Sequence, residues 1–189
     1  MEHSIEELIA VAYRHYPVGI WDENPAYRTS PEHQCLRAAI DSSGRFDPQW
    51  QRVLDRLAVR FKDCIAEEQT YMYIPSSRDV CYYGRLLLPE SPNQLQLVVV
   101  GLVSILVPYY FLFCKTTLPD GSMASRIRYE PMVIEEPYFR GFASEIESAF
   151  GYERMPPEVG LAIAPHVIAG NQTFGTATLY DCLFTDHRW

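Results

Sequence analysis

The side chains that could do chemistry are concentrated between residues 130 and 158, where carboxylates outnumber basic groups. Seven acidic residues face only two arginines there, so the segment carries a net charge of −5. Paired carboxylates can act as general acid and base, but on a helix and its flanks they are more often solvated, or form a surface for a basic partner. The candidate partner-binding carboxylates are Glu135, Glu136, Glu145, Glu147, Glu153 and Glu158.

The cysteines and histidines lack the spacing of a metal site. There is no CxxC, HxxxH or HExxH, and the five cysteines form no pattern typical of a disulfide framework. We expect buried, reduced thiols in a reducing cytoplasm, and no metal. A Cys–His nucleophile would need partners that only the fold could bring together. The cysteines are Cys35, Cys64, Cys81, Cys114 and Cys182, and the histidines are His3, His15, His33, His166 and His187.

Sequence motifs for covalent catalysis and nucleotide binding are also missing. The chain has no GxSxG, GxxxxGK[ST] or GxGxxG. These sequence patterns give no support to nucleotide binding, and we expect no cofactor.

Four helices are expected, three of them near the N-terminus. Ser4 starts the first at about 4–15, and the second is expected at about 31–42. Asp47 is expected to cap a third, which carries an apolar stripe from Trp50 to Phe61, and a fourth is expected at about 138–149. Residues 17–31 are expected to be irregular.

A sheet is expected to follow the third helix. The expected strands are 71–74, 81–88, one bent strand or two strands within 95–114, a polar edge strand at 125–131, and 176–184. Short links between successive strands favour an antiparallel meander. The sequence thus predicts one α+β domain over residues 1–189, with a mainly antiparallel central sheet of about five strands and the helices packed on it.

The uncharged run from Leu95 to Cys114 raises the question of a membrane span. Its twenty residues would be long enough for a spanning helix. However, Gly101 and Pro108 interrupt it, its residues are largely β-branched and aromatic, and no basic cluster flanks it. Buried strands are therefore the preferred interpretation.

The overall charge restricts the class of partner. With 24 acidic and 16 basic side chains, the net charge is −8, which disfavours binding to a nucleic-acid backbone. The same charge would attract a basic protein, although many proteins are acidic simply for solubility.

Four segments resemble a known class of protein: ELIAVAYRHYPVGI, CYYGRLLLP, LVPYYFLF and TLYDCLFTDHRW. Together they resemble immunity proteins that are encoded beside polymorphic or contact-dependent toxins in bacteria. The resemblance implies a non-enzymatic protein that binds a cognate toxin domain one to one and occludes it. An acidic balance fits a toxin that is a nuclease, whose substrate site is basic. Tyr82 and Tyr83 are candidate aromatic anchors, with the sheet core as the alternative position for both rings.

Two other classes of function stay open. One is a structural or adaptor subunit of a secretion or phage-derived assembly, which would self-associate or bind several proteins. The other is a small hydrolase, with a site assembled from dispersed cysteine, histidine or carboxylate side chains.

Overall fold

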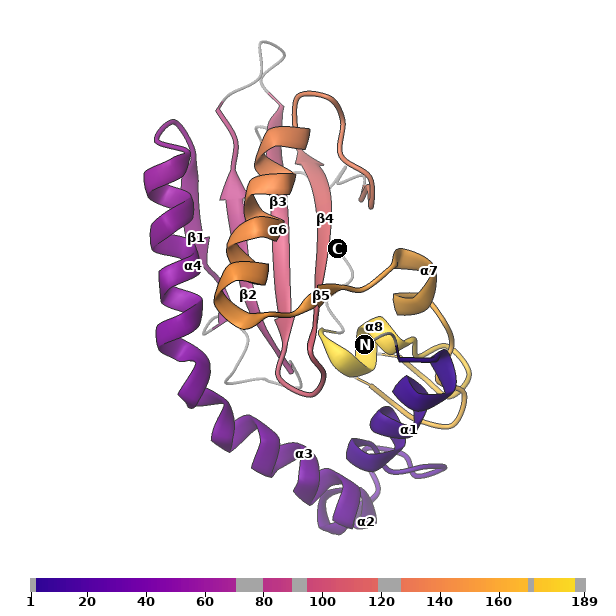
Figure 1. Ribbon diagram of the computed structural model, residues 1–189. Coiled ribbons are helices and arrows are strands. Elements are labelled where there is room, and N and C mark those ends of the chain that lie inside the picture. Colours follow the sequence, from indigo (N-terminus) through magenta and orange to yellow (C-terminus); the bar gives the residue numbers. More distant parts are fainter. Residues whose placement is uncertain (1–2, 71–79, 90–94, 119–126, 170–171, 186–189) are drawn as a thin grey trace.

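A five-stranded sheet forms the centre of the protein (Figure 1). The structure, a computed structural model, describes residues 3–70, 80–89, 95–118, 127–169 and 172–185. Along the sheet the strands keep the order of the sequence: β1 (Ile65–Glu68), β2 (Cys81–Leu87), β3 (Gln96–Ser104), β4 (Tyr109–Thr117) and β5 (Glu153–Arg154). The first four pair antiparallel, while β5 runs parallel to β4. The predicted α+β class with a mainly antiparallel sheet is confirmed.

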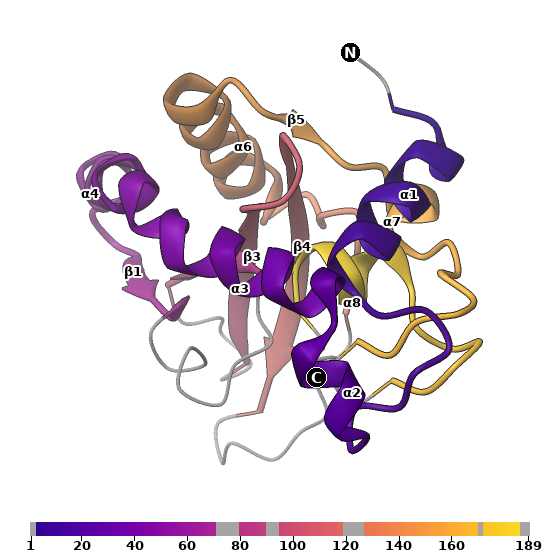
Figure 2. The ribbon, with the colours of Figure 1, turned by 90° about the horizontal axis from the view of Figure 1, so that it is seen from below.

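Helices cover both faces of this sheet. On one face lie α4 (Asp47–Arg60) and α6 (Glu136–Phe150), and on the other lie α1 (Ile5–His15) and α8 (Leu179–Leu183). Seen from below, α3 runs beneath the strands from the α1 side to the start of α4 (Figure 2). The other helical elements in the described ranges are α2 (Pro25–Thr29), α3 (Pro31–Ser42), the 3-10 turn η1 (Ser43–Phe46) and α7 (Pro157–Gly160).

The uncharged run forms the two central strands, β3 and β4. Its side chains alternate between the two cores: Val98 and Val100 face α1 and α8, whereas Val99 and Val103 face α4 and α6. Because both faces are covered, nearly every residue is apolar and the polar alternation of a half-exposed strand is lost. The two strands meet at a turn that contains Pro108, which has no amide hydrogen to give to the ladder. Among the described residues, no helix has the length and apolarity needed to cross a membrane.

Two glycines bring the helices α4 and α6 close to the sheet. Gly84 on β2 and Gly101 on β3 are directly paired across the strands. The indole of Trp50 rests on Gly84 and the ring of Phe142 rests on Gly101, and these two rings stack with centroids 6.4 Å apart. Any side chain at either glycine would occupy the space of a ring.

Several expectations need correction. The predicted final strand at 176–184 is wrong, because Thr178 and Asp181 form a reciprocal capping box that starts α8. Asp47 is the first residue of α4 rather than its cap; the cap position is Phe46. The predicted irregular segment 17–31 contains the short helix α2.

The predictions for the strands also differ in part from the structure. β1 and β5 were not expected, and of the predicted edge strand at 125–131 the described part shows one antiparallel bridge, between Arg128 and Cys114. The predicted strand at 71–74 lies outside the described residues.

Alanine at either of the paired glycines is expected to destabilise the fold. A Cβ on Gly84 would lie 2.6 Å from Cζ2 of Trp50, and one on Gly101 would lie 2.6 Å from Cζ of Phe142. Because both neighbours are rigid rings in a close-packed layer, we expect each variant to lose about 1–3 kcal/mol of unfolding free energy. Urea denaturation measures this loss.

Gly44→Ala is the matched control, since its Cβ would come no nearer than 3.6 Å to a side chain, that of Asp47. Its unfolding free energy is expected to change by less than about 1 kcal/mol. Equal losses in all three variants would contradict the close approach of helix and sheet.

Candidate functional site

The structure disperses the six candidate carboxylates rather than gathering them on one face. Glu135, just before α6, is fully buried. Its carboxylate pairs with the guanidinium of Arg128 and accepts a hydrogen bond from the backbone N–H of Met132 at 2.8 Å. Glu135 therefore fixes the loop that precedes α6, and no partner can reach its carboxylate.

The three carboxylates on α6 are held by neighbouring side chains. Glu136 pairs with Arg140 one turn later, at 2.5 Å. Glu145 lies 3.6 Å from both Arg56 and Arg60 of α4. Glu147 accepts a hydrogen bond from the hydroxyl of Tyr110 at 2.5 Å. These contacts neutralise much of the charge that the sequence concentrates there.

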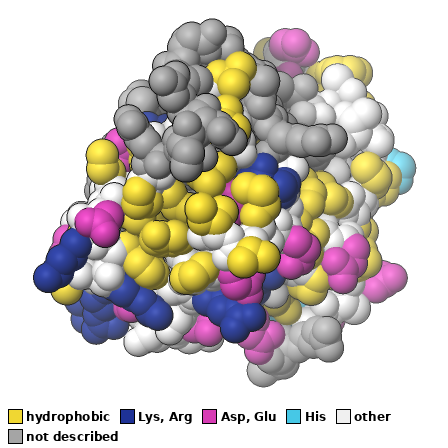
Figure 3. Space-filling view, turned by 90° about the horizontal axis from the view of Figure 1, so that it is seen from above, with side chains coloured by type: hydrophobic (Ala, Val, Ile, Leu, Met, Phe, Trp, Pro, Cys, Tyr) yellow, Lys and Arg dark blue, Asp and Glu magenta, His cyan; other side chains and the backbone are white. Residues whose placement is uncertain are grey.

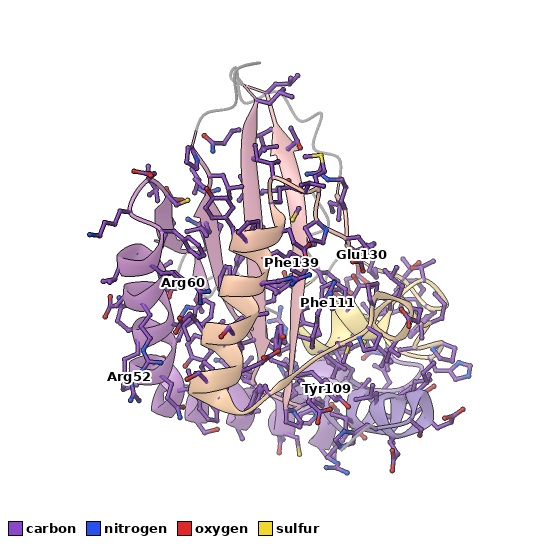
Figure 4. The ribbon with its side chains drawn as sticks, turned by 45° about the horizontal axis from the view of Figure 1, so that its top comes forward. Arg52, Arg60, Tyr109, Phe111, Glu130 and Phe139 are labelled. Atoms are coloured by element: carbon purple, nitrogen blue, oxygen red, sulfur yellow. The ribbon has the colours of Figure 1, made fainter. Side chains whose placement is uncertain are left out.

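The two guanidinium groups that oppose Glu145 come from a stripe on α4. Arg52, Arg56 and Arg60 follow one another at four-residue intervals, and the first and last can be found along the helix in Figure 4. Side chains at this spacing share one face of a helix. The α4–α6 surface is consequently mixed in charge rather than acidic.

The two tyrosines named as exposed anchors are buried, so that expectation is wrong. Tyr82 and Tyr83 follow each other on β2, and their side chains point to opposite faces of the sheet, into the two cores. The hydroxyl of Tyr82 is shared between the carbonyl oxygen of Ser43, at 2.7 Å, and Oδ1 of Asp47, at 2.5 Å. Both rings therefore lie in the core, which was the alternative to an exposed position on the sheet.

Glu153 and Glu158 lie elsewhere, beside a cleft of about 580 Å³ between the start of α1, β5 and α7. Both side chains are exposed. Apolar side chains make up much of the cleft wall, and the polar groups include the imidazole of His3 and the hydroxyl of Tyr109. The lining residues are His3, Ser4, Ile5, Leu8, Tyr109, Glu153, Arg154, Met155, Pro156 and Val159.

Local pairing explains how β5 builds one side of this cleft. The backbone N–H of Glu153 donates to the carbonyl oxygen of Pro108 at 3.2 Å, and the N–H of Met155 donates to that of Tyr110 at 2.8 Å. Glu153 pairs with Tyr109 and Arg154 with Tyr110, so their side chains leave the sheet on opposite faces.

The side chain of Arg154 accordingly lies on the α6 side of the sheet. Its guanidinium stands over the ring of Phe139, 4.7 Å from the centroid, and donates to the carbonyl oxygen of Tyr129 at 2.7 Å. Figure 4 shows Phe139 on α6 and Tyr109 at the lower end of β4.

The opposite side of the cleft is the first turn of α1. The hydroxyl of Tyr109 accepts a hydrogen bond from the backbone N–H of His3 at 3.0 Å, and lies 3.3 Å from Nδ1 of its ring. Ser4 and Glu7 form a reciprocal capping box. Glu6 and Glu7 of α1 are exposed but do not line the cleft, so the acidic part of its rim is Glu153, with exposed Glu158 beside the lining residue Val159.

The cysteines do not resemble activated nucleophiles. Burial raises the pKa of the Cys114 thiol to about 12, and desolvation also raises the pKa of Cys182 well above its ordinary value. The pKa of Cys64 rises to about 11, through desolvation first and the nearby charge of Asp63 second. A raised pKa removes the thiolate that nucleophilic attack requires. Within the described ranges, no cluster of three or more His, Cys, Asp or Glu side chains could hold a metal ion.

The sequence analysis found Glu153 and Glu158 but missed the cleft beside them. Tyr109 belongs to an apolar stretch that predicts only a buried strand. β5 has two residues, which is too short for a sequence pattern to predict a parallel strand. The Ser4 capping box was the one local clue to this wall of the cleft.

Comparison with known proteins adds no relative. No protein-family model matches the chain, and no curated protein and no solved structure is significantly similar to it. The functional argument therefore depends on the geometry described above.

Neutralising Glu135 is expected to destabilise the protein more than neutralising its neighbour. Glu135→Gln leaves the guanidinium of Arg128 without its buried counter-charge, and we expect a loss of about 2–3 kcal/mol of unfolding free energy. Glu136→Gln breaks an ion pair at the surface and should cost less than about 1 kcal/mol. Chemical denaturation of both variants at the same ionic strength measures the two unfolding free energies. Similar losses of unfolding free energy in the two variants would contradict the structural role of Glu135.

Thiol labelling should follow burial. With iodoacetamide at pH 8, the exposed Cys35 is expected to react first, while Cys114 and Cys182 react last because their raised pKa values leave little thiolate. Peptide mass spectrometry over a time course gives the order. Labelling of Cys182 as fast as Cys35 in the folded protein would contradict this environment.

Proposed function

We propose that this chain is a toxin-neutralising immunity protein, which binds a cognate toxin domain and occludes it without enzymatic activity. The observation that supports this proposal is the cleft beside β5, where an apolar wall adjoins the carboxylate of Glu153, with exposed Glu158 on the neighbouring helix α7. A protein surface with an apolar or aromatic side chain between basic ones would be complementary to it. Buried apolar contact would supply affinity, and the rim would select a basic partner such as a nuclease.

The size of the cleft suits an anchor rather than a whole interface. A stable protein–protein contact buries about 800 Å² on each partner. The partner would therefore cover the exposed first turn of α1 and the segment around α7, and insert a side chain between them. The carboxylates of Glu153 and Glu158 would be placed beside that anchor.

An adaptor or structural subunit is the second candidate, and a different surface favours it. The loop before α6 exposes Met132, Val133 and Ile134 in succession, with Val133 94% exposed. Figure 3 shows apolar side chains gathered over this end of the molecule, with basic and acidic groups around them. Such a surface is typical of protein–protein contact. The hydrolase alternative gains less support, because the pKa values of Cys64, Cys114 and Cys182 are all raised.

Co-expression tests the proposed function directly. The toxin candidate is the product of the neighbouring gene, and cells that express it should survive when this chain is present and die when it is absent. A one-to-one complex of the purified proteins is also expected. Cell death despite folded, soluble protein, together with the absence of a complex, would refute the proposal.

Charge reversal then tests the cleft as the binding surface. Glu153→Lys combined with Glu158→Lys should weaken binding about tenfold or more, because repulsion replaces attraction at the rim. The control reverses Glu32 and Asp41 to lysine on α3, which changes the net charge equally but lies away from the cleft. Isothermal titration at two salt concentrations compares the pairs. If both double variants bind the toxin with equal affinity, the cleft is not the binding surface. The proposed function would then require binding through another surface.

A further inference from the structure

A second, smaller pocket lies where the start of α4 meets β1 and β2. Its volume is about 260 Å³. That is below the range of about 300–1,000 Å³ for sites that enclose a small-molecule ligand, so it fits one side-chain-sized group. The residues that line it are Asp47, Pro48, Trp50, Gln51, Glu68 and Tyr82.

Two polar groups of this pocket have unmet hydrogen-bonding capacity. Trp50 is only 1% exposed, and its indole Nε1–H has no hydrogen-bond acceptor among the described residues. Oε1 of Glu68 accepts the backbone N–H of Thr70 at 2.6 Å, whereas Oε2 takes part in no hydrogen bond or ion pair in the described part of the chain. The indole is buried, and buried polar groups normally have partners, whereas the carboxylate of Glu68 is half-buried and open to a ligand from solvent. A ligand that satisfies both must bring donors for the carboxylate and an acceptor for the indole.

The position of Trp50 brings these two groups together. The edge of its ring lies on Gly84, and the Cα partner of Gly84 across the sheet is Glu68. Ala66, two residues before Glu68, packs into the α4–α6 core, so the side chain of Glu68 is on the same face as Trp50. Trp50 and Glu68 therefore line the same pocket from two adjacent elements.

The charge of the pocket favours a cation. The carboxylates of Asp47 and Glu68 both line it, and none of its lining residues is basic. The rings of Trp50 and Tyr82 are 5.9 Å apart and form the inner wall. Both rings are almost fully buried, at 1% and 4% exposed, so the attraction for a cation comes from the two carboxylates, to which a guanidinium brings several N–H donors.

We propose that this pocket binds the guanidinium of an arginine residue, with Glu68 and Asp47 as its anionic partners and a neighbouring carbonyl oxygen as the acceptor for Trp50. The site is at the β1 edge of the sheet, away from the cleft at β5 (Figure 1). It does not depend on the proposed function, since the arginine could belong to a protein partner or to a small molecule.

Titration followed by NMR tests the site in the full-length protein. The chain has three tryptophans, and the variants Trp21→Phe and Trp189→Phe identify the indole N–H signal of Trp50 by elimination. N-acetyl-L-arginine amide should shift that signal in a saturable way. N-acetyl-L-citrulline amide has nearly the same shape without the charge, and should bind at least tenfold more weakly. Propylguanidine keeps the single guanidinium charge but lacks the carbonyl oxygens, so it should perturb the indole signal less.

Glu68→Gln is the decisive variant. It keeps an oxygen for the N–H of Thr70 but removes the charge, and it should reduce affinity for the arginine derivative about tenfold. Glu32→Gln on α3 makes the same change of charge outside the pocket and should leave affinity unchanged. Binding of the arginine and citrulline derivatives with equal affinity, absence of any shift at Trp50, or equal effects of the two variants would each overturn the proposal.

Two further ligands distinguish the sources of arginine. If a peptide of the type acetyl-Gly-Arg-Gly-amide binds more tightly than free L-arginine, the pocket serves a protein partner. If free L-arginine binds more tightly, the pocket serves a small molecule. Either order supports the site.

Discussion

The contact of two aromatic rings with two paired glycines is the constraint on which the rest of the structure depends. Because Gly84 on β2 and Gly101 on β3 have no side chains, space is left on this face of the sheet. The rings of Trp50 from α4 and Phe142 from α6 occupy that space. The position of Trp50 sets the start of α4, and hence the pocket against β1. Phe142 sets α6, which ends at Gly151 in a left-handed conformation and leads directly into β5. The positions of both candidate sites therefore depend on this one layer of packed rings and glycines.

Charge is the property that changes most between the sequence and the fold. Residues 130–158 carry a large acidic excess, yet Arg128 comes from just outside the segment to pair with Glu135, and Arg56 and Arg60 come from a helix ninety residues earlier to pair with Glu145. Long-range pairing of this kind removes charge that a count along the chain assigns to the surface. The exposed carboxylates of this segment are Glu130, Glu147, Glu153 and Glu158, and the last two lie beside the cleft.

Local signals in the sequence were enough for most of the fold and for little of the candidate site. The Ser4 cap and the apolar stripe from Trp50 predicted α1 and α4, because caps and helical periodicity act over a few residues. The segment around Asp181 is buried on all sides, so its apolar residues could not distinguish a strand from a helix. β5 depends on a parallel partner 44 residues earlier in the chain, and the pocket depends on Glu68 of β1 and Trp50 of α4 lying on the same face of the sheet. Neither contact leaves a pattern in the neighbouring residues.

The separation of the two sites determines how a basic partner could use them. Four strand spacings of about 4.8 Å place β1 and β5 about 19 Å apart across the sheet. Sites this far apart that share no side chain contribute nearly independently to binding. A single inserted side chain can therefore occupy only one of them, and a partner that engages both must present two separate basic segments. Binding energy gained at the cleft is thus added to that gained at the arginine pocket, and loss of one site leaves the other intact.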